Sequence, residues 1–144
     1  MTRQRVTLFI VEDDKILLIH RIRDGNAYYI VPGGGVEEGE TIAAAAHREA
    51  AEETSLTIEL GPLLWQRPFS TPTSNGEFLE QLEHAYLITR FSGTPCLSGP
   101  EFERQSATNI YTLQWMSLAE FPNQVVYPSS INKAQLLIAL NREP

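Results

Sequence analysis

The chain has 144 residues and a mass of 16.2 kDa, a size that fits one domain and leaves little room for a second. Its formal net charge of −7 at pH 7 argues against a general nucleic-acid-binding protein, because neutralising backbone phosphates requires a basic surface. Hydrophobic residues make up 42% of the chain and charged residues 20%, which excludes a disordered protein. We expect a single domain over residues 1–144.

The first part of the chain predicts strands joined by tight turns. Two stretches rich in aliphatic residues, 6–10 and 16–22, flank an Asp-rich turn and predict a hairpin. A third strand is predicted over residues 28–31, Tyr-Tyr-Ile-Val. Pro32 should end this strand, and Gly33–Gly35 should open a loop.

The segment from Thr41 to Thr54 gives the strongest helix prediction. It is rich in alanine and contains neither glycine nor proline, and Thr41 is a suitable N-cap. An acidic turn precedes it, which suits the positive end of the helix dipole.

The second half predicts two further strands, around residues 83–91 and 109–116. A polar stretch at 68–77 and a Gly/Pro/Ser-rich stretch at 92–100 predict long loops. These elements predict an α/β fold with mixed strands.

The chain should end with a helix. Apolar residues from Ala134 to Leu140 predict it, and Ser130 is a candidate to cap its N-terminus.

The net charge is concentrated in one segment. Residues 37–53 contain six acidic residues against the single base Arg48, so this window carries −5 of the total charge. Within it, Glu49, Glu52 and Glu53 are spaced to share one helical face. Helix stability does not explain this repulsive arrangement, but the binding of a divalent cation does. Mg²⁺ or Mn²⁺ binds carboxylate oxygens and commonly shares its coordination shell with phosphates.

Acidic side chains on an Ala-rich helix can also form no more than a solvated face. The glycines Gly33–Gly35 just upstream favour a site instead, because backbone without side chains can approach a metal or a phosphate closely. Arg48, four residues before Glu52, is placed to hold that carboxylate in one rotamer.

The spacing of these residues resembles the Nudix box, whose pattern is G-x5-E-x7-R-E-U-x-E-E-x-G-U with U an aliphatic residue. The matching region covers 23 residues, and the preceding strands extend the resemblance to about residues 5–57. The residues at matching positions are Gly34, Glu40, Arg48, Glu49, Glu52, Glu53 and Leu56. Ser55 stands where the box has glycine, a position that ends the helix and often needs left-handed backbone.

The resemblance implies a Nudix-like α/β/α sandwich with a mixed sheet. It implies a hydrolase that uses Mg²⁺ or Mn²⁺ to cleave the diphosphate linkage of a nucleoside diphosphate derivative. The roles implied at the box positions are metal binding by Gly33, Glu49, Glu52 and Glu53, and catalysis by Glu52, Glu49 and Arg48. The proton of the attacking water could pass to Glu52, to Glu49 or to a carboxylate outside the box.

Residues near the box are candidates for substrate binding. Glu40 would brace the glycine loop against the helix, beside Gly34. Arg21 and Arg23 close the second predicted strand, and Arg21 is the better candidate to bind a phosphate, although an arginine at a strand end can equally be solvated.

Other side chains could extend the site. Four acids outside the box could supply a further carboxylate to the site or could lie on the surface: Glu80, Glu83, Glu101 and Glu103. Of these, Glu83 and Glu101 are the additional carboxylates that we expect in the site. The aromatics that could stack on a base or belong to the core are Tyr28, Tyr29, Trp65 and Phe69. His20, His47 and His84 lack the spacing of a metal site.

The substrate is left open by the residues outside the box. Ser70 lies where ADP-ribose hydrolases of the family have proline, and no tyrosine lies where dinucleoside polyphosphate hydrolases have one. Residues 65–70 match the NADH pyrophosphatase signature at too few positions to indicate NADH as the substrate. We expect a nucleoside triphosphate first and an ADP-sugar second, as a small-molecule partner.

Two other functions were considered. A Nudix-fold module that senses a nucleotide without cleaving it is disfavoured by the complete set of box carboxylates. An isomerase of isoprenyl diphosphates would need a catalytic cysteine near the diphosphate site. It is disfavoured because the single cysteine, Cys96, lies in a Pro/Ser/Gly-rich loop.

The remaining features concern the protein's surroundings. One cysteine cannot form an internal disulfide, and no apolar run is long enough to cross a membrane. We expect a cytoplasmic protein without a membrane partner, and a homodimer formed through the long loops is compatible with the sequence.

Overall fold

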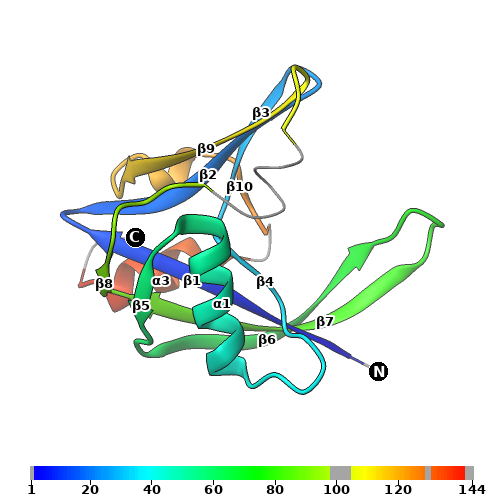
Figure 1. Ribbon diagram of the computed structural model, residues 1–144, viewed down its shortest axis with the longest axis horizontal. Helices are drawn as coiled ribbons and strands as arrows, with labels where there is room; N and C mark the ends of the chain where they lie inside the picture. The colour runs from blue at the N-terminus through cyan, green and yellow to red at the C-terminus, as the bar shows by residue number, and fades with distance from the viewer. Residues whose placement is uncertain (1, 98–104, 129–130, 142–144) are drawn as a thin grey trace.

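The computed structural model describes residues 2–97, 105–128 and 131–141, which form a mixed β-sheet with helices on both faces (Figure 1). The strands are β1 (Arg3–Glu12), β2 (Lys15–Arg23), β3 (Asn26–Ile30), β4 (Gly33–Gly35), β5 (Thr57–Glu59), β6 (Leu63–Pro72), β7 (Phe78–Ile88), β8 (Arg90–Ser92), β9 (Asn109–Ser117) and β10 (Val126–Tyr127). The helices are α1 (Ile42–Thr54), the 3-10 helix η1 (Phe121–Asn123) and α3 (Lys133–Ala139).

The sheet is organised around β1. The strand order is β10-β3-β2-β1-β7-β6, with β4 also paired to β1 and β9 to β2. The C-terminal end of β1 forms the expected hairpin with β2, and Asp13 and Asp14 adopt left-handed backbone in the turn. The N-terminal half of β1 instead lies between β4 and the parallel strand β7. The glycine segment therefore lies directly beside β1.

Alternate residues of β1 face the two helices. Val6, Leu8 and Ile10 belong to the core that includes the alanines of α1, and all three are fully buried. Phe9 faces the other way and belongs to the core that includes Leu136 of α3. This period-2 alternation explains why an almost continuously apolar strand lies at the centre of the fold. The arrangement confirms the expected α/β class.

Two stretches expected to be loops are strands. Gly33–Gly35 form β4, antiparallel to β1, because a strand of glycines can lie flat against its neighbour. Residues 68–72 of the expected polar loop continue β6, which pairs with β7 as far as Pro72 and Phe78. Prolines are tolerated here because β6 is an edge strand, whose outward backbone groups need no sheet partner. Figure 1 shows this hairpin extending away from the body.

The closing helix is present as expected and is capped by Asn132. Asn132 caps α3, where its side-chain oxygen accepts a hydrogen bond from the Gln135 backbone N–H at 2.9 Å. Ser130, the expected cap, lies outside the described residues. None of the helices in the described ranges is both long and apolar enough to cross a membrane.

The central helix, α1, has the expected ends. The Thr41 hydroxyl accepts a hydrogen bond from the Ala44 N–H at 3.0 Å. At the other end Ser55 has φ 63° and ψ 14°, the left-handed conformation for which the glycine of the box is suited. The Ser55 hydroxyl donates to the Cys96 carbonyl at 2.7 Å, and this bond offsets part of the cost of a side chain in that conformation.

Replacing Ser55 should separate backbone strain from hydrogen bonding. S55G relieves the left-handed strain and loses the hydroxyl bond, whereas S55A keeps the strain and loses the same bond. We expect S55G to be more stable than S55A by about 1 kcal/mol, and close to the wild type, in urea unfolding. Equal stability of the two variants would show that the helix end carries no such strain.

Candidate active site

Helix α1 presents its acidic residues along the margin of its packed face. Ala45, Ala46 and Ala50 are fully buried against the sheet, which brings the helix backbone close to β1. Glu49 and Glu53, one turn apart, lie beside this contact and are only 8% and 5% exposed. The packing of small residues therefore carries two carboxylates into the interior.

The glycine strand makes room for these carboxylates. A Cβ atom on Gly34 would collide with the carboxylate of Glu49, and one on Gly33 would collide with the carbonyl of Val6. The Gly33 N–H also donates to Glu53 Oε1 at 3.4 Å. Glycine is required here because both β1 and the helix carboxylates approach the backbone of β4.

Arg48 links the helix, the turn before it and β4. Its Nε and Nη2 donate to the two oxygens of Glu40 at 2.8 and 2.9 Å, and Nη2 also donates to the Gly35 carbonyl at 2.9 Å. Its Nη1 donates to Glu49 at 2.9 Å and to Glu52 at 3.3 Å. One guanidinium therefore orients three carboxylates, and its pKa is raised, first by the hydrogen bonds to Glu40.

Hydrogen bonds hold Glu40 in place in the turn before α1. Besides Arg48, it accepts a hydrogen bond from the Glu37 backbone N–H at 3.0 Å. The hydrogen bond from Arg48, followed by the one from Glu37, lowers the pKa of Glu40 to about 2. The carboxylate therefore stays ionised, and closes the turn, over the whole physiological pH range.

Glu49 and Glu53 form a buried acidic pair. Burial raises the pKa of Glu49, while hydrogen bonds from Glu53 and Arg48 act in the opposite direction. A hydrogen bond between two carboxyl groups requires a proton on one of them. A divalent cation could take the place of that proton.

The donor set fits a hard cation in its chemistry. Glu49 and Glu53 contribute carboxylate oxygens beside the backbone of Gly33, whereas the Glu52 side chain is 41% exposed and turned towards Arg48. Within the described ranges, no three His, Cys, Asp or Glu side chains converge as a metal site. The structure therefore brings two of the three expected carboxylates together and leaves Glu52 at the solvent edge.

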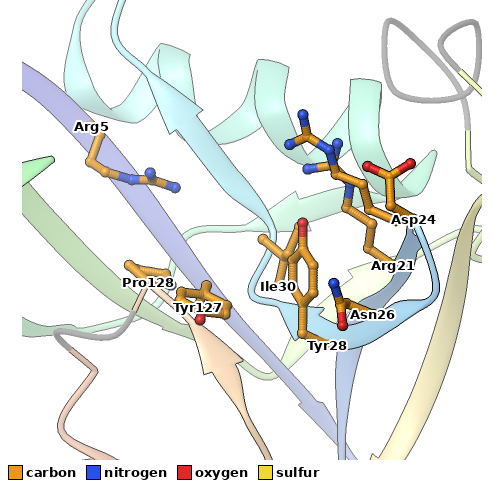
Figure 2. Close-up of a pocket in the computed structure, with 9 residues that line it drawn as sticks. Arg5, Arg21, Asp24, Asn26, Tyr28, Ile30, Tyr127 and Pro128 are labelled. Carbon is orange, nitrogen blue, oxygen red and sulfur yellow. The ribbon is translucent and has the colours of Figure 1, made fainter. Parts of the chain in front are cut away.

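A cavity of about 620 Å³ is lined by residues of β1, β2, β3 and β10 (Figure 2). It is lined by Arg5, Arg21, Arg23, Asp24, Asn26, Tyr28, Ile30, Tyr127 and Pro128. Three arginines against one acid make it basic, in contrast to the acidic helix. The rings of Tyr28 and Tyr127 meet edge to face at 5.3 Å and form an aromatic wall.

Arg21 lies in this cavity, as its predicted role requires. Its Nε donates to the Asn109 side chain at 3.0 Å, and its guanidinium carbon lies 4.8 Å from the centre of the Tyr111 ring. These contacts fix the side chain and leave other N–H groups of the guanidinium for a ligand. Arg23, the weaker candidate, lines the same cavity.

Glu83 has the contacts of a structural acid. It is fully buried, and its two oxygens accept hydrogen bonds from Thr7 at 2.7 Å and from the Trp65 indole at 2.6 Å. Arg67 lies 3.9 Å away and packs over the Trp65 ring. Trp65 therefore belongs to the core and is not available to stack on a base.

The other candidates lie apart from the pair. The Ser70 hydroxyl donates to Glu80 at 2.6 Å on the β6–β7 hairpin, and Cys96 is exposed. His84 is buried between Gln66 and Gln4. Glu101 and Glu103 lie outside the described residues.

Sequence reasoning missed Arg5 and Tyr127. Arg5 enters the cavity because β1 pairs with β4 and β7, and Tyr127 does so because β10 pairs in parallel with β3. Both pairings join segments distant in the sequence, so no local pattern could have revealed them. The only local hint was for Arg5, a charged residue at the start of an otherwise apolar strand.

Comparisons with known proteins agree with this geometry. The family model described as NUDIX domain matches residues 1–136. The chain is 38% identical over 98 residues to the NAD-capped RNA hydrolase NudC of Edwardsiella ictaluri, a match covering 68% of this chain and 35% of that protein. It is 41% identical over 56 residues to the uncharacterized Nudix hydrolase YvcI of Bacillus subtilis, covering 38% and 34%. The chain spans about a third of the length of the curated relatives it matches.

Solved structures resemble the whole chain. The crystal structure of the MutT NUDIX hydrolase from Burkholderia pseudomallei has a TM-score of 0.72 and 27% identity, covering 94% of this chain and 98% of that one. The solution structure of the E. coli ORF135 protein has a TM-score of 0.71 and 25% identity, covering 97% and 91%. Both matches confirm the fold.

The buried pair predicts a pH dependence of stability in the absence of metal. The pKa of Glu49 is raised above its ordinary value of 4.5, so the folded protein binds this proton more tightly than the unfolded chain does. The resulting contribution to stability is fully present at low pH. That contribution should be lost as the pH rises through the raised pKa. The free energy of unfolding of the wild type minus that of E49Q should therefore fall as the pH rises above about 4.5.

Urea unfolding at several pH values with a chelator present measures this difference. E59Q, which removes an exposed acid on β5, is the matched control and should follow the wild type closely. Parallel pH profiles for E49Q and the wild type would contradict the assignment of a buried, protonated pair.

Proposed function

Because the chain belongs to the NUDIX domain family, we propose that it is a divalent-metal-dependent hydrolase of the diphosphate linkage in a nucleoside diphosphate derivative. The observation that carries this proposal is the pair of buried carboxylates, Glu49 and Glu53, whose charges interact with Arg5 of a basic cavity. Acids that hold a cation and arginines that hold phosphates are the two halves of a phosphoryl-transfer site.

The two halves are joined through β1 and β4. Arg5 of the cavity pairs with Gly35 in the sheet, and its positive charge interacts with Glu53 and Glu49. A phosphate chain in the cavity would therefore extend towards the acidic pair.

The residues that would hold Mg²⁺ or Mn²⁺ are Glu49, Glu53 and the Gly33 backbone, with Glu52 at the solvent side. When bound, the ion would neutralise phosphate charge and lower the pKa of a water molecule. The chain supplies the orientation, because Arg48 fixes the rotamers of Glu49 and Glu52 before any ligand arrives.

Glu52 is the carboxylate that we assign to proton acceptance. Its 41% exposed side chain can reach water, whereas Glu49 and Glu53 are buried and hydrogen-bonded to each other. Arg48 donates a hydrogen bond to Glu52 at 3.3 Å and so orients this carboxylate. Arg48 acts here by positioning, together with Glu40.

A nucleoside triphosphate remains our first choice of substrate, and an ADP-sugar the second. The arginines of the cavity suit a phosphate-rich ligand, and the wall of Tyr28 and Tyr127 suits a base or a ribose face. Because one relative is named as a hydrolase of NAD-capped RNA and another as an RNA pyrophosphohydrolase, 5′-capped and 5′-triphosphate RNA are also to be tested.

A substrate screen tests the proposed activity. Nucleoside triphosphates, ADP-ribose, dinucleoside polyphosphates, NADH and NAD-capped RNA are incubated with Mg²⁺, and release of phosphate, pyrophosphate or mononucleotide is measured. We expect hydrolysis of at least one nucleotide, and none in excess chelator. Tight binding of a nucleotide without hydrolysis would instead support the sensing module.

Substitution of Glu52 tests the proton acceptor. E52Q keeps the size of the side chain and removes its basicity, so turnover should fall at least ~100-fold while the melting temperature changes little. E59Q on β5 should retain full activity. Turnover of E52Q near that of the wild type would remove Glu52 from the mechanism.

A further inference from the structure

Arg5 is the arginine of the cavity that sequence reasoning did not single out. It lies on β1, hydrogen-bonded in the sheet to β4 and β7, where its partners in register are Gly35 and Glu83. Figure 2 shows its guanidinium pointing into the region enclosed by the lining residues, on the opposite side of Tyr28 and Ile30 from Arg21. It therefore approaches the cavity from a different wall.

The guanidinium of Arg5 has an unmet hydrogen-bonding group. Its Nε is buried and has no hydrogen-bond partner within the described ranges. Burial lowers the pKa of Arg5, and the neighbouring charges of Glu83, Glu53 and Glu49 oppose that change. A buried donor of this kind destabilises the protein as long as it remains unsatisfied.

Glu83, the register partner of Arg5 on β7, does not meet this need. Its two oxygens accept hydrogen bonds from the Thr7 hydroxyl and the Trp65 indole, and within the described ranges none joins it to Arg5 Nε. Glu83 therefore supplies negative charge near Arg5 without binding its Nε–H. Because Arg5 lines the cavity, a ligand there that carries acceptor oxygens would supply this partner.

We propose that Arg5 is a phosphate-binding residue of this site, whose guanidinium binds the substrate's phosphate chain from the β1 wall while Arg21 and Arg23 bind it from the end of β2. This inference rests on the proposed function for the identity of the ligand. Contacts from two walls favour a ligand with several consecutive phosphates over one with a single phosphate, since a longer chain offers more oxygens to donors on separate strands.

Inorganic tripolyphosphate provides a probe without a nucleoside and without a requirement for turnover. Binding is followed by NMR of the arginine Nε–H signals in the absence of metal, and dissociation constants are compared with those for orthophosphate. We expect the Arg5 Nε–H signal to move on addition of tripolyphosphate. R5M should weaken tripolyphosphate binding at least about 10-fold, and R5K should recover part of the loss.

R90M, which removes an exposed arginine on β8, is the matched control and should bind tripolyphosphate as the wild type does. Thermal melts establish that R5M is folded, and R5K serves as the test if R5M is not. An unmoved Arg5 signal, wild-type affinity in R5M, or no binding of tripolyphosphate by the wild type would overturn the inference.

The outcome is distinguishable from failure of the proposed function. Hydrolysis in the substrate screen with unchanged KM in R5M would leave the activity in place and remove Arg5 from the binding site. Binding of tripolyphosphate through Arg5 in a protein that hydrolyses nothing would leave the phosphate site in place and remove the activity.

Discussion

The site depends on the hydrogen bonds of one side chain, Arg48. Its guanidinium reaches Glu40 before the helix, Gly35 on β4, and Glu49 and Glu52 on its own helix. Without these bonds the acidic side chains would repel one another and the turn before α1 would have no bridge to the sheet. Arg48 is itself only 22% exposed, so its interactions are screened less by solvent than those of a surface ion pair.

The net charge of −7 is unevenly distributed over the structure. The acidic residues concentrate around α1, whereas the cavity beside them is lined by three arginines and a single acid. On the proposed function, cations bind at the acidic helix and anions bind in the basic cavity. An acidic overall charge is compatible with a phosphate-rich ligand, because the basic wall and any bound cation determine the local potential.

The helix and its acids could be predicted from the sequence because they follow local rules. The Thr41 cap, the left-handed Ser55 and the shared face of the glutamates each depend on a few neighbouring residues. The parallel pairing of β1 with β7 joins residues nearly eighty positions apart, and neither the burial of Glu83 nor the place of Arg5 has a local signal. The same limit explains β6, whose prolines suggested a loop until the sheet made it an edge strand.

Proton release on metal binding is the most direct test of the central claim that Glu49, oriented by Arg48, forms a buried carboxyl pair with Glu53 that is ready for a cation. Calorimetric titration with Mg²⁺ at several pH values, in buffers of different ionisation enthalpy, measures the protons released per ion bound. The account predicts a net release that disappears in E49Q. Binding heats that are the same in every buffer would show that no shared proton is displaced, and would contradict the account.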